Sequence, residues 1–276
     1  MSEVTSTEAG HPLKRLPHRL ALDTPDRNIL ASLSPGGEVI LEGVWGAGCA
    51  VVAAAVAESV NRPILLVLPS LTQIEALAGS LAVFTDLSIA TFPAWESSPD
   101  ERLIRDDIYA ARLKVLKTAA HQKLPRLVVT SIESLLQPVP SRDNILENSR
   151  RIQVGETVEA EKLGSWLLSH KYHFTSAVEL PGEYSLRGGI LDIFALDGDA
   201  PVRIEFFGDE IESIRTIDVA TQRSVETLDQ IEITALRHTK KSPGNFLDFV
   251  PEETILALVE LEQMRQSADH YLERLE

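Results

Sequence analysis

The first half of the chain alternates short apolar runs with longer amphipathic segments. The runs are rich in Val, Ile and Leu and have the length of buried strands: Val39–Leu41, Pro63–Leu68, Ser88–Phe92 and Leu127–Thr130. The segments between them carry apolar residues at helical spacing: Cys49–Val60, Leu71–Phe84 and Glu101–Ala120. Apolar strands separated by helices predict a parallel sheet covered on both faces. We therefore expect residues 21–139 to form the first part of an α/β domain.

The periodicity changes after residue 139. Residues 140–237 contain one helical stretch, Ala160–Ser169, and then short runs that alternate at period two: Ile190–Phe194, Val202–Phe207 and Glu210–Arg215. Turn residues separate these runs, which predicts antiparallel strands with one packed helix, an inserted α+β domain. In residues 238–276, the run Thr254–Val259 and the amphipathic segment Leu261–Leu275 predict a strand and a helix that return to the first domain. Residues 1–20 are expected to be a flexible N-terminus.

Composition and charge narrow the class of protein. The chain has 276 residues, 44% hydrophobic and 24% charged, which is typical of a globular protein with more than one domain. Its single cysteine cannot form an intrachain disulfide, which favours a cytoplasmic location. The net charge of −15 argues against general nucleic-acid binding, because binding to phosphates needs a basic surface. A protein partner is the better expectation.

The stretch GVWGAGCA, residues 43–50, has the setting of a phosphate-binding P-loop. It follows a predicted strand and precedes a predicted helix, as that motif requires. Gly43 and Gly48 fall on the two glycine positions of the pattern G-x-x-x-x-G-K-[ST], and Gly46 lies between them. The first domain is therefore predicted to have a P-loop, RecA/helicase-like fold.

The chemistry of the P-loop is missing from this stretch. Cys49 stands where the motif has the lysine that reaches the phosphates, and Ala50 stands where it has the magnesium-binding hydroxyl. Val259–Glu260 occupies the place where a working enzyme has the Asp-Glu pair that holds magnesium. We interpret the loop as degenerate: it keeps the scaffold, and we expect no catalytic residue and no cofactor in this chain. His170 and His173 are spaced as metal ligands but have no third ligand nearby in the sequence, so no metal site is expected.

The alternating runs of the insert predict one apolar and one polar sheet face. In the run Val202–Phe207, the even-numbered residues are apolar, whereas Arg203, Glu205 and Phe207 share the other face. An arginine beside an exposed aromatic ring is typical of the centre of a protein–protein interface. The pattern fits a second interpretation equally well, in which Arg203 pairs with Glu205 or a cross-strand acid and Phe207 packs in the hairpin turn.

Two longer stretches resemble a known family. Residues 180–225, LPGEYSLRGGILDIFALDGDAPVRIEFFGDEIESIRTIDVATQRSV, resemble the domain shared by the excision-repair protein UvrB and the bacterial transcription-repair coupling factors (Mfd). Residues 92–116, FPAWESSPDERLIRDDIYAARLKVL, are similar to the corresponding segment of the coupling factors. UvrB differs there and keeps a full P-loop. The resemblance therefore indicates the N-terminal UvrB-like module of the coupling-factor family, over about residues 15–276.

The resemblance implies a function for the insert, residues 140–237, as a domain like domain 2 of UvrB. In the family this domain binds UvrA, and the arginines and phenylalanine that contact UvrA fall on Arg187, Arg203 and Phe207. The implied function is a non-catalytic module that recruits nucleotide excision repair to stalled RNA polymerase. The same resemblance places contacts to RNA polymerase and DNA, and the ATP and Mg²⁺ of the translocase, in regions outside this chain. The alternative is a variant helicase or ATPase domain that still binds nucleotide and DNA.

Overall fold

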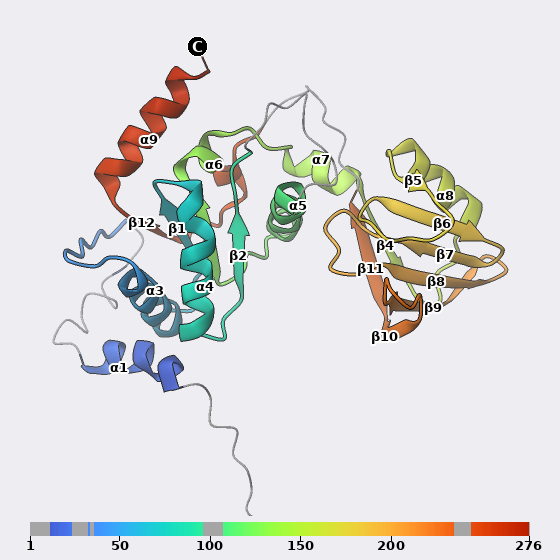
Figure 1. Ribbon diagram of the computed structural model, residues 1–276, viewed down its shortest axis with the longest axis horizontal. Coiled ribbons are helices and arrows are strands. Elements are labelled where there is room, and N and C mark those ends of the chain that lie inside the picture. The colour runs from blue at the N-terminus through green and yellow to red at the C-terminus, as the bar shows by residue number, and fades with distance from the viewer. Residues whose placement is uncertain (1–11, 24–32, 34–35, 96–106, 235–243, 276) are drawn as a thin grey trace, which may run out of the picture. The chain divides into compact units, whose positions relative to one another are not determined.

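The computed structural model describes residues 12–23, 33, 36–95, 107–234 and 244–275, and the chain divides into two compact units. Unit 1 comprises Met1–Ala94, Gln122–Gln137 and Val250–Glu276, and unit 2 comprises Trp95–His121 and Pro138–Phe249. Each unit is therefore built from segments that are distant in the sequence (Figure 1).

Unit 1 is built on a parallel sheet. Its described strands lie in the order β12-β1-β3-β2, with every neighbouring pair parallel: β1 (Ile64–Leu68), β2 (Ile89–Phe92), β3 (Leu127–Ser131) and β12 (Ile255–Leu258). The helices are η1 (Pro12–Lys14), α1 (Arg15–Asp23), α3 (Ala47–Ser59), η2 (Leu71–Gln73), α4 (Ile74–Phe84), α6 (Ile132–Leu136) and α9 (Leu261–Glu273). The parallel sheet that the apolar runs predicted is confirmed. β12 joins this sheet although residues 138–249, which belong to unit 2, separate it from the earlier part of unit 1 in the sequence.

The core of unit 1 follows from the composition of its elements. All residues of β1 and β3 are buried, because central strands of a parallel sheet have neighbours on both edges and cover on both faces. Helix α3 is almost wholly apolar, and its alanines let it pack closely with α4 against Ile64, Leu66 and Val129. A cluster of small and branched apolar side chains thus joins helices and sheet.

Two predictions for unit 1 differ from the structure. The run Val39–Leu41 is not a strand, and the side chain of Ile40 is 77% exposed. Residues 12–20 were expected to belong to a flexible terminus, yet they lie in η1 and α1, where Lys14 pairs with Asp86 and α1 packs on α3. Residues 1–11 lie outside the described part. Contacts with residues distant in sequence hold η1 and α1 in place, whereas among the described residues no strand pairs with Val39–Leu41.

The edge position of β12 explains a further difference. The apolar run Thr254–Val259 was read as a buried strand, but Leu256 and Leu258 are 54% and 52% exposed. Within the described residues β12 pairs with β1 along one edge only. Alternate side chains are therefore left uncovered, although the run is as apolar as the central strands.

Unit 2 contains a six-stranded, mostly antiparallel sheet in the order β10-β9-β8-β7-β6-β5, in which only the β5–β6 pair is parallel (Figure 1). Its strands are β5 (His173–Phe174), β6 (Glu183–Arg187), β7 (Ile190–Ile193), β8 (Val202–Phe207), β9 (Glu210–Ile217) and β10 (Ser224–Leu228). A second, two-stranded sheet pairs β4 (Ser149–Gln153) with β11 (Gln230–Thr234). The helices are α5 (Asp107–Ala120), α7 (Arg142–Glu147), α8 (Ala160–Ser169) and η3 (Phe246–Phe249).

One face of the six-stranded sheet is buried against α8. Leu163 and Leu167 of α8 are fully buried in one cluster with Leu191, Ile204 and other residues from the inner faces of the strands. Gly164 lies over the sheet so closely that an added Cβ would be 3.3 Å from Leu186 Cδ2. The antiparallel strands predicted for the insert are confirmed, and so is α8 as a packed helix. The prediction of a single helix is wrong, because α7 also lies within residues 140–237 and buries Ile145.

Helix α5 belongs to unit 2, whereas the sequence pattern placed its residues in the first domain, within residues 21–139. Tyr109 and Leu113 of α5 are buried in the same cluster as the inner face of the six-stranded sheet. Lys117 donates a hydrogen bond to Asp197 at 2.9 Å and to the carbonyl oxygen of Glu232 at 2.6 Å. These partners are distant from α5 in the sequence. Helical periodicity therefore predicts that α5 is a helix, but it does not predict which of the two hydrophobic cores the helix packs against. No helix of the described residues is long and apolar enough to span a membrane.

Candidate functional site

The outer face of the six-stranded sheet is polar, as the alternation along β8 predicted. Ile204 and Phe206 point into the core and are 0% and 9% exposed, whereas Phe207 on the outer face is 79% exposed. Phe207 does not pack in the hairpin turn, so that part of the second interpretation is wrong. An uncovered phenyl ring of this size is the most prominent apolar feature of the outer face of β8.

Arg203, in contrast, has the cross-strand partner that the second interpretation required. Its Nε donates to Asp192 Oδ1 at 2.7 Å and its Nη2 donates to Asp192 Oδ2 at 2.8 Å. Asp192 lies directly opposite on β7. The hydrogen bonds to Asp192 raise the pKa of Arg203 above its ordinary value, and the charges of Asp192 and Glu205 add to the effect. The two hydrogen bonds hold the charged arginine across the sheet.

A second set of charges lies beside this pair on the same face. Glu205 Oε2 accepts a hydrogen bond from Ser213 Oγ at 2.6 Å and lies 3.7 Å from Arg215 Nη1. Arg215 is directly opposite Arg203 in the register between β8 and β9. Two like charges in that position repel, and the carboxylates of Asp192 and Glu205 offset the repulsion. The outer face thus carries two arginines and two carboxylates, and the ring of Phe207 lies at the end of β8 on the same face.

Arg187 lies at the end of β6, on the same face of the sheet. It is opposite Ile190, which is in turn opposite Glu205. Strand register therefore places Arg187 on the face that carries these charged side chains. Its side chain is exposed, and its Nη2 donates to the carbonyl oxygen of Ser176. The structure therefore brings the three predicted contact residues, Arg187, Arg203 and Phe207, onto one sheet face.

The turn after Arg187 needs its two glycines. Gly188 has φ of 57°, a conformation that other residues rarely adopt. A Cβ on Gly189 would be 2.8 Å from the carbonyl oxygen of Phe206, too close for any side chain. The same close approach lets the amide of Phe206 donate to the carbonyl oxygen of Gly189 at 2.7 Å. The glycine pair thus fixes the spacing between Arg187 and the strand that carries Phe207.

The glycine-rich stretch of unit 1 forms the entrance to α3. Gly43 and Gly46 have φ of 75° and 55°, and Gly46 is the residue that precedes the first turn of the helix. Gly48 lies within that first turn. The chain therefore makes a tight turn into the helix with glycines at the positions that need them.

The two residues after these glycines lie in an apolar environment. Ala50 is fully buried against the unit 1 core, and Cys49 is half-buried, with its Sγ 3.6 Å from the carbonyl oxygen of Val44. Burial raises the pKa of the Cys49 thiol, and the nearby negative charge of Glu260 raises it further. A carboxylate at this place disfavours a bound phosphate, whereas the lysine of a P-loop would attract it.

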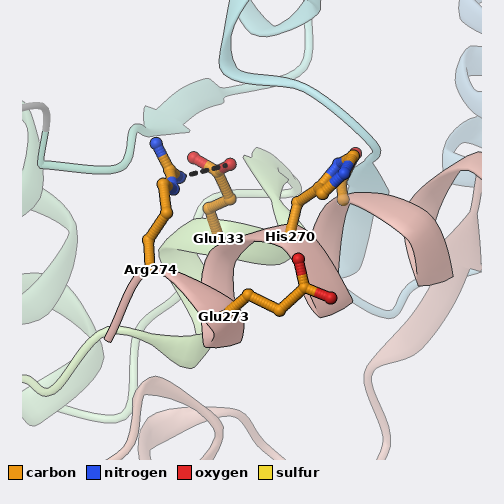
Figure 2. A pocket seen from close by; sticks show the side chains of 5 residues that line it. Glu133, His270, Glu273 and Arg274 are labelled. Atoms are coloured by element: carbon orange, nitrogen blue, oxygen red, sulfur yellow. Dashed lines mark hydrogen bonds and ion pairs between the residues drawn. The ribbon is translucent and has the colours of Figure 1, made fainter. Parts of the chain in front are cut away.

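An open polar pocket of about 580 Å³ lies between α6 and α9 in unit 1 (Figure 2). It is lined by Glu133, Ser267, His270, Glu273 and Arg274, and Arg274 Nη2 donates to Glu133 Oε1 at 3.2 Å. The pocket has no apolar wall that would hold an organic ligand. Among the described residues, no group of three or more His, Cys, Asp or Glu side chains is placed to bind a metal ion.

Comparison with known proteins assigns the six-stranded sheet and helix α8 to a known family of domains. Residues 151–238 match the family model described as the UvrB interaction domain, and this range contains the polar face with Arg187, Arg203 and Phe207. The resemblance that the sequence motifs predicted is therefore confirmed.

Transcription-repair-coupling factors of several bacteria are similar to this chain over much of its length. The chain is 31% identical to the Bacillus subtilis protein over 239 residues, which cover 86% of this chain and 20% of the relative. It is 38% identical to the Mycobacterium bovis protein over 175 residues, 60% of this chain and 14% of the relative. It is 30% identical to the Escherichia coli protein over 199 residues, 72% of this chain and 17% of the relative. The chain thus spans about a fifth or less of the length of the relatives it matches.

The sequence predicted that Arg203 could pair with Glu205 or with a cross-strand acid, but it did not identify that acid as Asp192. The register between β7 and β8 decides the pairing, since it sets Asp192 opposite Arg203. The alternation of both strands, aligned through the turn between them, was the one signal that pointed to it.

Proposed function

We propose that unit 2 is a docking module for UvrA, and that the chain is the UvrB-like part of a transcription-repair coupling factor. In this function the module recruits nucleotide excision repair to stalled RNA polymerase. The observation that carries the proposal is the 79% exposure of Phe207 on the sheet face that also carries Arg203, inside the segment that matches the UvrB interaction domain. A large ring left uncovered on a polar face that also carries arginines has the composition of an interface centre.

Unit 1 acts in this proposal as a RecA/helicase-like scaffold with a degenerate P-loop. Cys49 and Ala50 supply neither the charge that binds phosphates nor the hydroxyl that binds Mg²⁺, and Glu260 adds a negative charge near Cys49. The module is therefore non-catalytic. Contacts to RNA polymerase and DNA, and ATP hydrolysis, belong to other regions of the full-length coupling factors.

The proposal is tested by calorimetric titration of UvrA into the chain and its variants. Arg187→Ala, Arg203→Ala and Phe207→Ala should each weaken binding by about 1–4 kcal/mol, as substitutions at an interface centre do. Phe174→Ala is the matched control for the ring: Phe174 is 62% exposed and contacts Tyr184, whose side chain is on the inner face of the sheet. Arg223→Ala, in the exposed turn between β9 and β10, is the matched control for the arginines.

The controls should bind UvrA like the unsubstituted chain. Equal affinity for all three variants of the polar face would refute the proposal, as would an equal loss of affinity in Phe174→Ala and Phe207→Ala. A circular dichroism melt of every variant separates lost binding from lost folding.

A further inference from the structure

Toward the residues that the structure describes, Arg203 donates hydrogen bonds from one edge of its guanidinium group. Nε donates a hydrogen bond to Asp192 at 2.7 Å, and Nη2 donates one at 2.8 Å. These two nitrogens form the side edge of the guanidinium group. The guanidinium is planar and has five N–H donors in a fixed arrangement. Its end edge, formed by Nη1 and the second hydrogen of Nη2, therefore points away from Asp192.

The end edge matches the geometry of a second carboxylate. Two parallel N–H donors from Nη1 and Nη2 fit the two oxygens of a carboxylate, just as the side edge fits Asp192. A further carboxylate at the end edge would place the guanidinium group between two carboxylates. The side chain of Arg203 is 23% exposed and that of Asp192 is 13% exposed, so the acid lies deeper than the arginine.

Asp192 also removes much of the freedom of the arginine. A long, exposed side chain loses rotamer entropy when a partner immobilises it, and this loss weakens binding. The paired arginine has already lost that entropy on folding. Repulsion from Arg215, directly opposite in the register, would displace an Arg203 that had no Asp192 to hold it.

We propose that Asp192 is a positioning residue that holds Arg203 by its side edge and presents the end edge to a carboxylate of the partner protein. The inference rests on the proposed function, since UvrA is the partner that the test uses. It assigns the interface a chemistry: an acidic side chain of UvrA binds Arg203, and an apolar group of UvrA contacts Phe207 on the same sheet face.

The decisive experiment is a double-mutant cycle in the full chain, with affinity for UvrA measured by calorimetry. Asp192→Ala should weaken binding about 3- to 10-fold, the range that corresponds to ordering one long side chain. In the Arg203→Ala background, Asp192→Ala should have no further effect, because the acid acts only through the arginine. Arg203→Lys should bind as weakly as Arg203→Ala, since an ammonium group cannot donate from both edges.

Two controls separate positioning from stability and from charge. Glu226→Ala removes one negative charge on β10, two strands from Arg203, and should leave UvrA affinity unchanged. A ¹H–¹⁵N spectrum of the arginine Nε–H groups needs no partner: the Arg203 signal should exchange slowly with solvent, and Asp192→Ala should make it exchange fast.

The outcomes distinguish the inference from the function it rests on. A failure of the unsubstituted chain to bind UvrA overturns both. Binding that is sensitive to Arg203→Ala but indifferent to Asp192→Ala, or tighter in Asp192→Ala, overturns the inference alone. A rapidly exchanging Arg203 Nε–H in the unsubstituted chain also overturns it, whatever UvrA does.

Discussion

Phe206 and Phe207 are adjacent on β8 and occupy opposite faces of the sheet, so truncating each should have opposite consequences. Phe206 is 9% exposed and packs among the inner-face residues of unit 2, whereas Phe207 is 79% exposed. We expect Phe206→Ala to destabilise unit 2 with little direct effect on the polar face. Phe207→Ala should leave stability almost unchanged and reduce affinity for UvrA.

The magnitudes follow from the exposed fractions. A buried phenylalanine removes roughly 150–250 Å² from water, at about 25 cal/mol per Å². Because part of that area is retained by alanine and the cavity is not refilled, Phe206→Ala should lower the free energy of unfolding by about 3–5 kcal/mol. Phe207 buries about a fifth of its surface, so the same substitution should change the free energy of unfolding by less than about 1 kcal/mol.

Scanning calorimetry checks this pair directly. The loss expected for Phe206→Ala lowers the Tm of unit 2 by roughly 10–20 °C, while the Tm of Phe207→Ala stays close to that of the unsubstituted chain. Equal shifts of Tm would show that the two rings do not lie on opposite faces. A Phe207→Ala protein that melts as early as Phe206→Ala would refute the assignment of the polar face, and with it the basis for the docking surface.

Three further predictions concern groups away from this strand. Burial and the charge of Glu260 raise the pKa of Cys49, and the thiolate is the form that reacts with iodoacetamide. The rate of alkylation should therefore reach half its maximum at a higher pH than it does for free cysteine. A midpoint at or below that of free cysteine would contradict this prediction. Burial, and then the charge of Asp197, raise the pKa of Tyr109 and Tyr172, so the folded unit keeps these phenols protonated where the unfolded chain ionises them. This difference leaves the free energy of unfolding unchanged below about pH 10 and lowers it as the pH rises above that value. The midpoint of urea unfolding should therefore be lower at pH 11 than at pH 8. Equal midpoints would contradict this prediction. Finally, calorimetry with ATP and Mg²⁺ should detect no binding tighter than millimolar, because Cys49 replaces the phosphate-binding lysine; micromolar binding that is lost on substitution at Gly48 would show that the loop still functions.

Local periodicity predicted those elements whose environment is decided within a few residues. Helix α8 spans the residues predicted for it, Ala160–Ser169, and the period-two runs became β7, β8 and β9. Alternation also assigned Ile204 and Phe206 to the core, because successive side chains of a strand must point to opposite faces. The apolar runs of β1 and β3 likewise predicted strands of a parallel sheet, because both faces of such strands are covered.

Tertiary structure decided every question that depended on a partner distant in the chain. Helix α5 joins unit 2 because Tyr109 and Leu113 fit its core, although helical spacing suits either unit. The run Val39–Leu41 is as apolar as a strand, yet it is not one, since a strand also needs a neighbour whose backbone pairs with it.

The same distinction between sequence and tertiary structure holds for the residues of the candidate site. The sequence determined that Arg203 and Phe207 share a face, since alternation is a property of one strand. Only the structure showed that Phe207 is uncovered and that Asp192, not Glu205, holds Arg203 by two hydrogen bonds. Exposure and cross-strand pairing depend on which strands lie side by side and in what register, and these are fixed by the packing of the whole sheet.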